Sequence, residues 1–213
     1  MKVPSVQGEI DSFLTSCANG IIPLKGWIHP LGFVHVKALV NGNDDSKIRF
    51  RFWETGMDPA VIGKLDRIHN HAFDFTSFIL CGAILEKRYE VLPASVGSHH
   101  IWEVDNLGGR STLRKTGVAC NVREVESISH ISKASYTLAA GIYHDAVAVK
   151  NCTATLVFET PQPEIASLVI CDKQTKRIAS NPWPDVSRET IISLIRKVIG
   201  KRTMECGQAQ MRG

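Results

Sequence analysis

The stretch that decides the fold is GKLDRIHNHAFDFTSFILCG, residues 63–82. Two histidines, His69 and His71, stand two positions apart in it, and aromatic and β-branched residues follow them. Side chains two positions apart on a β-strand point to the same face, so both imidazoles would share one face with the ring of Phe75. Large aromatic side chains beside the histidines favour an inward-facing position, where two imidazoles can chelate one metal ion.

The rest of the sequence predicts an all-β protein with a helix near each end. Short alternating or β-branched runs recur between turn signals, and no long helical segment separates them. They cover residues 33–40, 47–54, 66–91, 97–106, 117–132, 134–149, 152–160 and 166–172. This pattern predicts a sandwich or a barrel. Apolar residues at helical spacing predict one helix over 7–18 and another over 186–202, with Ser187 as its N-cap and a disordered tail of about ten residues after it.

Composition limits the class of protein. The chain has 213 residues, of which 44% are hydrophobic and 22% charged, so it suits one domain with extensions or at most two small domains. The net charge of +4 is carried by no dense lysine and arginine run, so we expect no nucleic-acid partner. The six cysteines form no C-x-x-C pair, which indicates reduced thiols and a cytoplasmic protein. We find no signal peptide and no apolar stretch of about 20 residues, so we expect no membrane span.

A third histidine occurs in a second strand–turn–strand unit, LAAGIYHDA, where His144 follows a glycine and begins a β-rich run. With residues 63–82, this unit resembles the two motifs of the cupin superfamily. The first cupin motif has the form G-x5-H-x-H-x3-E-x6-G. The chain matches that motif at Gly63, His69, His71 and Gly82.

Two departures from the cupin pattern occur in the remaining positions. Phe75 stands where the first motif has its glutamate. The second cupin motif is P-x-G-x2-H followed by an asparagine, and Gly141 and His144 match its central part. Ala139 replaces the proline of that motif and Ala148 replaces the asparagine.

The resemblance covers about residues 30–172 and implies a cupin-type double-stranded β-helix barrel over that range. Residues 1–29 would then form an N-terminal helical or irregular extension. Residues 173–213 would form a C-terminal helix, packed outside the barrel, and a tail.

The missing glutamate implies a particular kind of metal site. The chain resembles three-histidine cupins, a group that includes thiol dioxygenases such as cysteine dioxygenase, with His69, His71 and His144 as the ligands of one divalent metal. Three neutral imidazoles leave the ion its full charge and open positions on one face, which suits Fe(II) acting on a chelating substrate and O2. Zn(II), Ni(II) or Mn(II) would also fit these ligands. Asp74 cannot easily replace the glutamate, because its strand parity places it on the face opposite His71.

Several other residues are weaker candidates for contacts with a substrate: Arg51, Arg67, Phe75, Tyr89 and Trp102. An inward arginine would hold a substrate carboxylate through two hydrogen bonds. The alternative for Arg51 is a solvent-facing position, with Phe50 and Phe52 filling the core. The alternative for Tyr89 and Trp102 is ordinary core packing. No residue is assigned a catalytic role.

Three functions from different classes fit these observations. We favour a non-haem Fe(II) oxygenase that acts on a small molecule with O2. A metal-dependent isomerase, lyase or hydrolase would use the ion as a Lewis acid instead, and a non-enzymatic cupin would only bind a small molecule. We expect a monomer or a homodimer.

Overall fold

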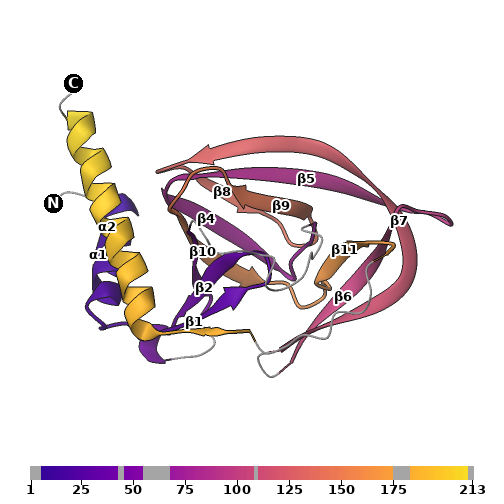
Figure 1. The fold of residues 1–213 in the computed structure, drawn as a ribbon, viewed down its shortest axis with the longest axis horizontal. Helices are drawn as coiled ribbons and strands as arrows, with labels where there is room; N and C mark the ends of the chain where they lie inside the picture. The colour runs from indigo at the N-terminus through magenta and orange to yellow at the C-terminus, as the bar shows by residue number, and fades with distance from the viewer. Residues whose placement is uncertain (1–5, 43–45, 55–67, 108–109, 175–182, 211–213) are drawn as a thin grey trace.

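The structure, a computed structural model, has two antiparallel sheets and a helix at each end of its described part (Figure 1). It describes residues 6–42, 46–54, 68–107, 110–174 and 183–210, without the side chains of 105–107, 110–111 and 206–210. The helices are α1 (Val6–Ala18) and α2 (Arg188–Gln210), and one short 3-10 turn, η1, covers Val40–Gly42.

The larger sheet contains seven of the described strands. These are β1 (Leu24–His29), β2 (Phe33–Ala38), β3 (Ile48–Trp53), β4 (Phe73–Cys81), β8 (Ser135–Leu138), β10 (Thr153–Pro161) and β12 (Asp185–Val186), in the spatial order β12-β1-β2-β3-β10-β4-β8. The smaller sheet contains β5 (Ala83–Pro93), β6 (His99–Leu107), β7 (Arg110–Ile131), β9 (Tyr143–Ala148) and β11 (Leu168–Asp172), in the order β11-β6-β7-β5-β9.

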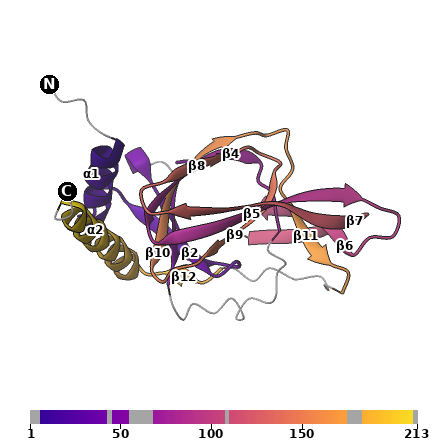
Figure 2. The same ribbon diagram turned by 90° about the horizontal axis from the view of Figure 1, so that it is seen from above.

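The predicted all-β class is confirmed: two antiparallel sheets carry N-terminal and C-terminal helices outside them, an arrangement consistent with the expected cupin-type barrel. Figures 1 and 2 both show the two helices together at one side of the strands. The larger sheet extends beyond the predicted barrel range of 30–172, because β1 lies before residue 30 and β12 lies after residue 172.

The C-terminal helix is longer than the sequence pattern predicts. The hydroxyl of Ser187 accepts a hydrogen bond from the backbone N–H of Thr190 at 3.2 Å, so Ser187 acts as the expected N-cap. The prediction of a disordered tail is wrong for residues 204–210, which continue α2. Buried Arg202 holds this part of the helix, since its guanidinium binds the Asp11 carboxylate of α1 at 2.7 Å.

The main hydrophobic core lies between the helices and the outer face of the larger sheet. Its buried members include Leu14, Val34, Val36, Phe50, Phe52, Leu80, Leu156, Ile191 and Ile195. Each large side chain buried there contributes roughly 1.5–3 kcal/mol. Gly26 permits this packing, because a Cβ at its position would lie 2.9 Å from the Ile191 side chain of α2.

The inner face of the same sheet is polar and aromatic, and it faces the smaller sheet. Phe75 of β4 lies 5.9 Å from the ring of His144 in β9. Tyr136 of β8 stacks on His130 of β7, with ring centroids 4.0 Å apart. Strands of both sheets surround this interior in Figure 2, and we call the space between their inner faces the lumen.

A short segment before β4, residues 68–71, joins the two edges of the smaller sheet. His69 forms β-bridges both to His144 in β9 and to Val169 in β11, which are the outermost strands of that sheet. The amides of His69 and His144 each donate to the other's carbonyl, at 3.0 and 2.8 Å. The long β-run predicted for 66–91 therefore begins as a strand only at Phe73 and is interrupted at Gly82.

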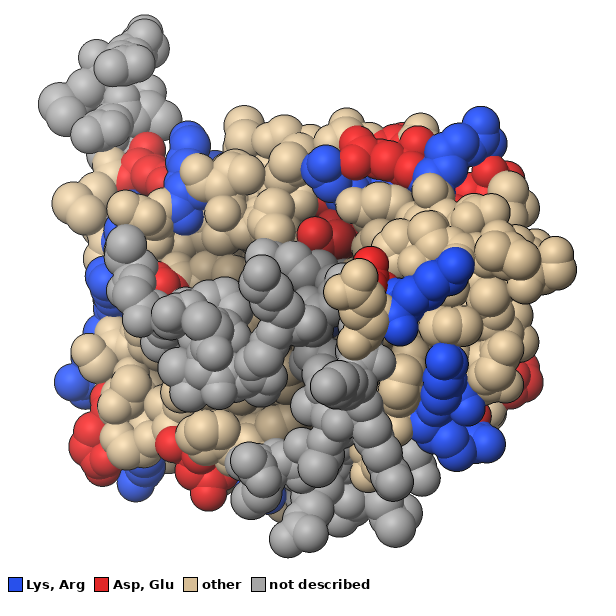
Figure 3. Space-filling model, turned by 45° about the vertical axis from the view of Figure 1, so that its right-hand side comes forward, with Lys and Arg blue, Asp and Glu red and all other residues tan. Residues whose placement is uncertain are grey.

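The surface charges are mixed, as the composition indicates, and two buried cysteines have raised pKa values. Figure 3 shows one face, on which acidic side chains lie among the lysines and arginines. Burial raises the pKa of Cys17 to about 12 and that of Cys81 to about 11, so both thiols stay protonated. Neither α1 nor α2 carries an apolar stretch long enough to cross a membrane.

Candidate metal centre

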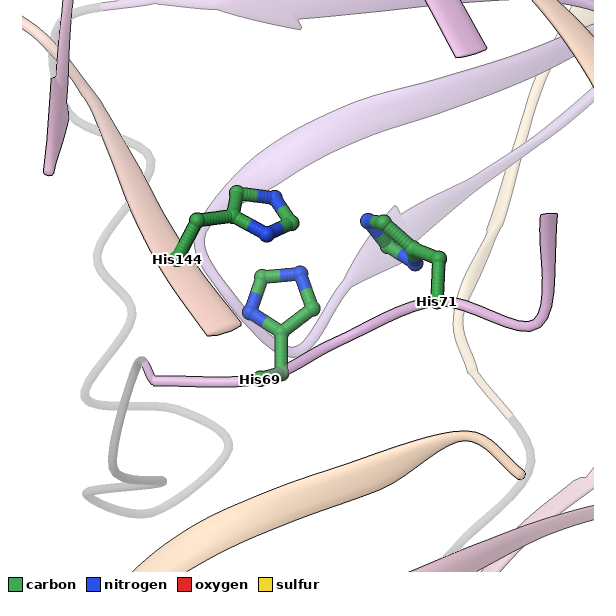
Figure 4. A group of neighbouring side chains, drawn as sticks. All are labelled: His69, His71 and His144. Carbon is green, nitrogen blue, oxygen red and sulfur yellow. The ribbon is translucent and has the colours of Figure 1, made fainter. Parts of the chain in front are cut away.

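Three histidines converge in the lumen, as Figure 4 shows. The ring centroids of His69 and His144 are 4.5 Å apart, those of His69 and His71 are 4.7 Å apart, and those of His71 and His144 are 5.0 Å apart. Each ring has a nitrogen within 4.8 Å of a nitrogen on the other two. The three residues predicted as ligands therefore lie together, although 73 positions of the chain separate His71 from His144.

Backbone geometry brings them together. His69 and His144 are directly paired, and paired residues on neighbouring strands present their side chains to the same face. His71 lies two positions further along, and its carbonyl accepts a hydrogen bond from the Gly141 amide at 3.1 Å. Gly141 has a φ of 80°, a conformation that favours glycine, so the turn leading into β9 is fixed next to the histidine segment.

The environment keeps the imidazoles of His71 and His144 neutral. Burial lowers the pKa of His71 well below its usual range, and the nearby His69 and His144 lower it further. Burial likewise lowers the pKa of His144, with a further contribution from His69. Neutral imidazoles retain the lone pair that a metal requires.

The hydrogen bonds also leave suitable nitrogens free to bind a metal. His144 Nδ1 lies 3.2 Å from the carbonyl of Ile142, so this nitrogen carries the proton and Nε2 keeps its lone pair. His71 Nε2 is buried and has no hydrogen-bond partner. Two nitrogens bound to one zinc-like ion lie about 3.0–3.4 Å apart, so side-chain rotations from the observed spacing would suffice. The three histidines therefore fit a divalent metal.

No carboxylate belongs to this cluster among the described residues. Phe75, in the position of the cupin glutamate, is 2% exposed, and its ring lies 5.6 Å from that of His71. Asp74 points elsewhere, since its carboxylate accepts hydrogen bonds from the Ala140 amide and the Gln162 side chain. These bonds lower the pKa of Asp74 and hold it ionised away from the histidines.

The residues predicted as weaker candidates for substrate contacts lie in different parts of the fold. Arg51 is buried, not solvent-facing, and its guanidinium carbon lies 5.5 Å from the Phe75 ring centroid. Trp102 pairs with Val169, which in turn bridges His69, so it lies two strands away on the same face and packs in a small apolar cluster. Tyr89 pairs with Tyr143 and alternates with Arg88, the partner of His144.

Tyr89 therefore lies on the face of the smaller sheet opposite His144. Arg67 lies outside the described residues.

A buried ionic network beside the centre is not evident from the sequence. Glu86, fully buried on β5, accepts hydrogen bonds from Arg88 Nε and His130 Nε2, both at 2.7 Å. Arg88 is the direct strand partner of His144, so this network supports the strand that carries the third histidine. The run EKRYE reads as an exposed charged strand, and only its alternation hints that Glu86 and Arg88 share one face.

Comparisons with solved structures return a cupin domain and two other proteins, all at low similarity. The cupin domain of Drosophila melanogaster CENP-C aligns at 8% identity over 73% of this chain and 99% of that chain, with a TM-score of 0.38. Hydroquinone 1,2-dioxygenase from Sphingomonas sp. TTNP3, with 4-hydroxybenzoate bound, aligns at 14% identity over 56% of this chain and 65% of that chain, with a TM-score of 0.29. E. coli ycfD aligns at 9% identity over 77% of this chain and 47% of that chain, with a TM-score of 0.34.

No family model and no curated protein matches the chain. These similarities are too weak to transfer a function, and the chemistry of the site must be argued from its own residues.

Proposed function

We propose that the protein is a metal-dependent cupin enzyme, a non-haem Fe(II) oxygenase that acts on a small molecule. The observation that carries the proposal is the cluster of three imidazoles in the lumen with nitrogens within 4.8 Å of one another. His69, His71 and His144 would hold one divalent ion. Fe(II) bound there would supply redox chemistry between an organic substrate and O2.

The described residues bring no carboxylate into the cluster, and a set of three imidazoles favours Fe(II) oxygenase chemistry. Three neutral ligands bring no negative charge, so the ion would keep its full charge for an anionic or chelating substrate. The Phe75 ring lines one side of the histidines and excludes water from it. The Ile142 carbonyl orients the His144 ring through Nδ1, and the Glu86–Arg88 pair stiffens the neighbouring strand.

Metal analysis combined with oxygen uptake tests the proposal. The purified protein should contain close to one equivalent of a divalent metal, and Fe(II)-loaded protein should consume O2 in the presence of a member of a panel of small thiols and carboxylates. The His144→Ala variant should show neither property.

The two other classes would give different results. Retained metal with substrate turnover but no O2 uptake would assign the Lewis-acid class. A folded protein that binds no divalent metal would overturn the proposal and favour a non-enzymatic binding protein. The cytoplasmic location and the monomeric or dimeric state stay predictions.

A further inference from the structure

The inner face of the larger sheet carries a row of buried polar atoms that lack partners. Trp27, His35, Arg51 and Thr155 occupy directly paired positions on the adjacent strands β1, β2, β3 and β10. Their Nε1, Nε2, Nε and Oγ1 atoms are buried and have no hydrogen-bond partner among the described residues. Trp53 Nε1, two positions from Arg51 on the same face, is also buried without a hydrogen-bond partner among the described residues. With strands about 4.8 Å apart, the row spans roughly 14 Å.

The atoms in this row are mainly donors. The indole nitrogens of Trp27 and Trp53 and the guanidinium of Arg51 can only donate, whereas a hydroxyl such as that of Thr155 can donate or accept. Buried polar groups in folded proteins nearly always have partners, so five unpaired atoms on one inner face indicate a bound molecule that supplies acceptors.

The charge at the centre of the row is positive and has no ion-pair partner among the described residues. Arg51, which carries this charge, is 8% exposed. Glu159 forms its ion pair with Arg49 at 3.4 Å and attracts Arg51 only at longer range. His35 adds no negative charge, and burial lowers its pKa so that it stays neutral. An unpaired buried cation is unfavourable, and an anionic ligand would compensate it.

The row borders the histidine cluster in the same lumen. The Arg51 guanidinium carbon lies 5.5 Å from the Phe75 ring centroid and 5.7 Å from that of Phe33. The same Phe75 ring lies 5.6 Å from the ring of His71. One aromatic ring therefore separates the arginine from the candidate metal ligands, a distance that a small organic molecule can bridge.

We propose that this row is an anion subsite, in which Arg51 and its strand partner Thr155 bind a carboxylate of the substrate and Trp27 and Trp53 donate to any further acceptor oxygens of that substrate. The ligand is a small carboxylic acid with a flat body, because aromatic rings line the row: Trp27 stacks on His35 at 4.5 Å, and Phe33 lies tilted against Trp53 at 5.1 Å. The inference rests on the proposed function only where it names this acid as the substrate, since the subsite itself requires no metal.

Tryptophan fluorescence and calorimetric titration with benzoate test the subsite, with neutral benzamide and inorganic phosphate as comparison probes. Benzoate should bind the wild-type protein and quench its fluorescence, and benzamide and phosphate should bind at least tenfold more weakly. Arg51→Gln should weaken benzoate binding about 10- to 100-fold, the range expected for lost hydrogen bonds to a charged group. The nearly isosteric Thr155→Val should weaken it several-fold. Arg114→Gln, at a surface arginine whose side chain is 72% exposed, should leave binding unchanged.

The His144→Ala variant separates this inference from the proposed function. Benzoate binding that persists in His144→Ala and is lost in Arg51→Gln supports the subsite, whatever the metal content. Binding that is lost in His144→Ala but kept in folded Arg51→Gln would mean that the carboxylate binds the metal, and it would overturn the subsite. Phosphate binding without benzoate binding would overturn the assignment to carboxylic acids, and failure of benzoate to bind the wild-type protein would overturn it as well. If Arg51→Gln does not fold, the Thr155→Val variant decides instead: benzoate binding as tight as in the wild-type protein would overturn the subsite.

Discussion

His144 is the residue on which the metal proposal depends most directly, because it comes from a different strand than the H-x-H pair. Removing its imidazole should lower metal affinity by at least about 10- to 100-fold, the loss that changes to groups outside the ligand set already cause. Metal content of His144→Ala after dialysis, measured by elemental analysis, checks this. His99→Ala on β6 is the matched control and should retain its metal. Full occupancy in His144→Ala would show that the third ligand is misassigned.

Phe75 decides how many positions on the metal stay open. In Phe75→Glu, the new carboxylate would face the histidines and should slow metal dissociation, while occupying a position that a substrate needs, so turnover should fall. The new carboxylate would take the place of the Phe75 ring, whose centroid lies 5.5 Å from the Arg51 guanidinium carbon. The positive charge of Arg51 should therefore offset part of the free-energy cost of burying the carboxylate.

The control for this variant is Phe75→Gln, which loses the same packing without adding a charge. Metal dissociation rates and thermal unfolding of both variants are the measurements. A destabilised Phe75→Glu protein with unchanged metal dissociation would contradict the proposed role of the ring.

At the scale of single elements, the junction of β4 and β5 depends on Gly82. Its φ is 80°, and a Cβ there would lie 2.2 Å from Thr153 Oγ1 and 2.7 Å from Thr153 Cα. Gly82→Ala should therefore cost more than the roughly 1–3 kcal/mol of backbone strain alone. Gly117, with a φ of 85° and no atom near its missing Cβ, provides the control, since Gly117→Ala should show only the strain. Equal unfolding free energies for the two variants, from urea titration, would argue against the contact with Thr153.

The strand alternation and helix spacing of the sequence were sufficient to predict the all-β class and both helices. The convergence of His144 with His69 and His71 was implied by the resemblance to the two cupin motifs. The position of Arg51 was not decided by alternation, because the larger sheet is buried on both faces. Phe50 and Phe52 pack under the helices, while Arg51 faces the lumen. A prediction that assigns one face of a strand to the core and the other to solvent does not allow for a strand that is buried on both faces. The pairing of Glu86 with His130 joins residues 44 positions apart, so no local pattern could reveal it.

For the whole molecule, the lumen should make stability depend on pH. Burial lowers the pKa of His29, His35, His71 and His144 well below 6.5 in the folded protein. The unfolded chain therefore binds more protons below about pH 6.5, and the free energy of unfolding should fall as the pH drops, by up to about 1.4 kcal/mol per pH unit for each histidine. Urea unfolding in EDTA at pH 7.5, 6.5 and 5.5 measures this. A free energy of unfolding that does not change between pH 6.5 and 5.5 would exclude buried neutral histidines.

The segment that carries His69 has a consequence for how the protein behaves in concentrated solution. It covers the hydrogen-bonding edges of β9 and β11, and a sheet edge that loses its cover can pair with another chain. A metal bound by His69, His71 and His144 would pin this segment in place. Chelation should therefore promote self-association through exposed edges, seen as rising light scattering on adding EDTA and reversed by Fe(II) or Zn(II). Scattering that stays flat after the metal is removed would mean that backbone hydrogen bonds alone keep the edges covered.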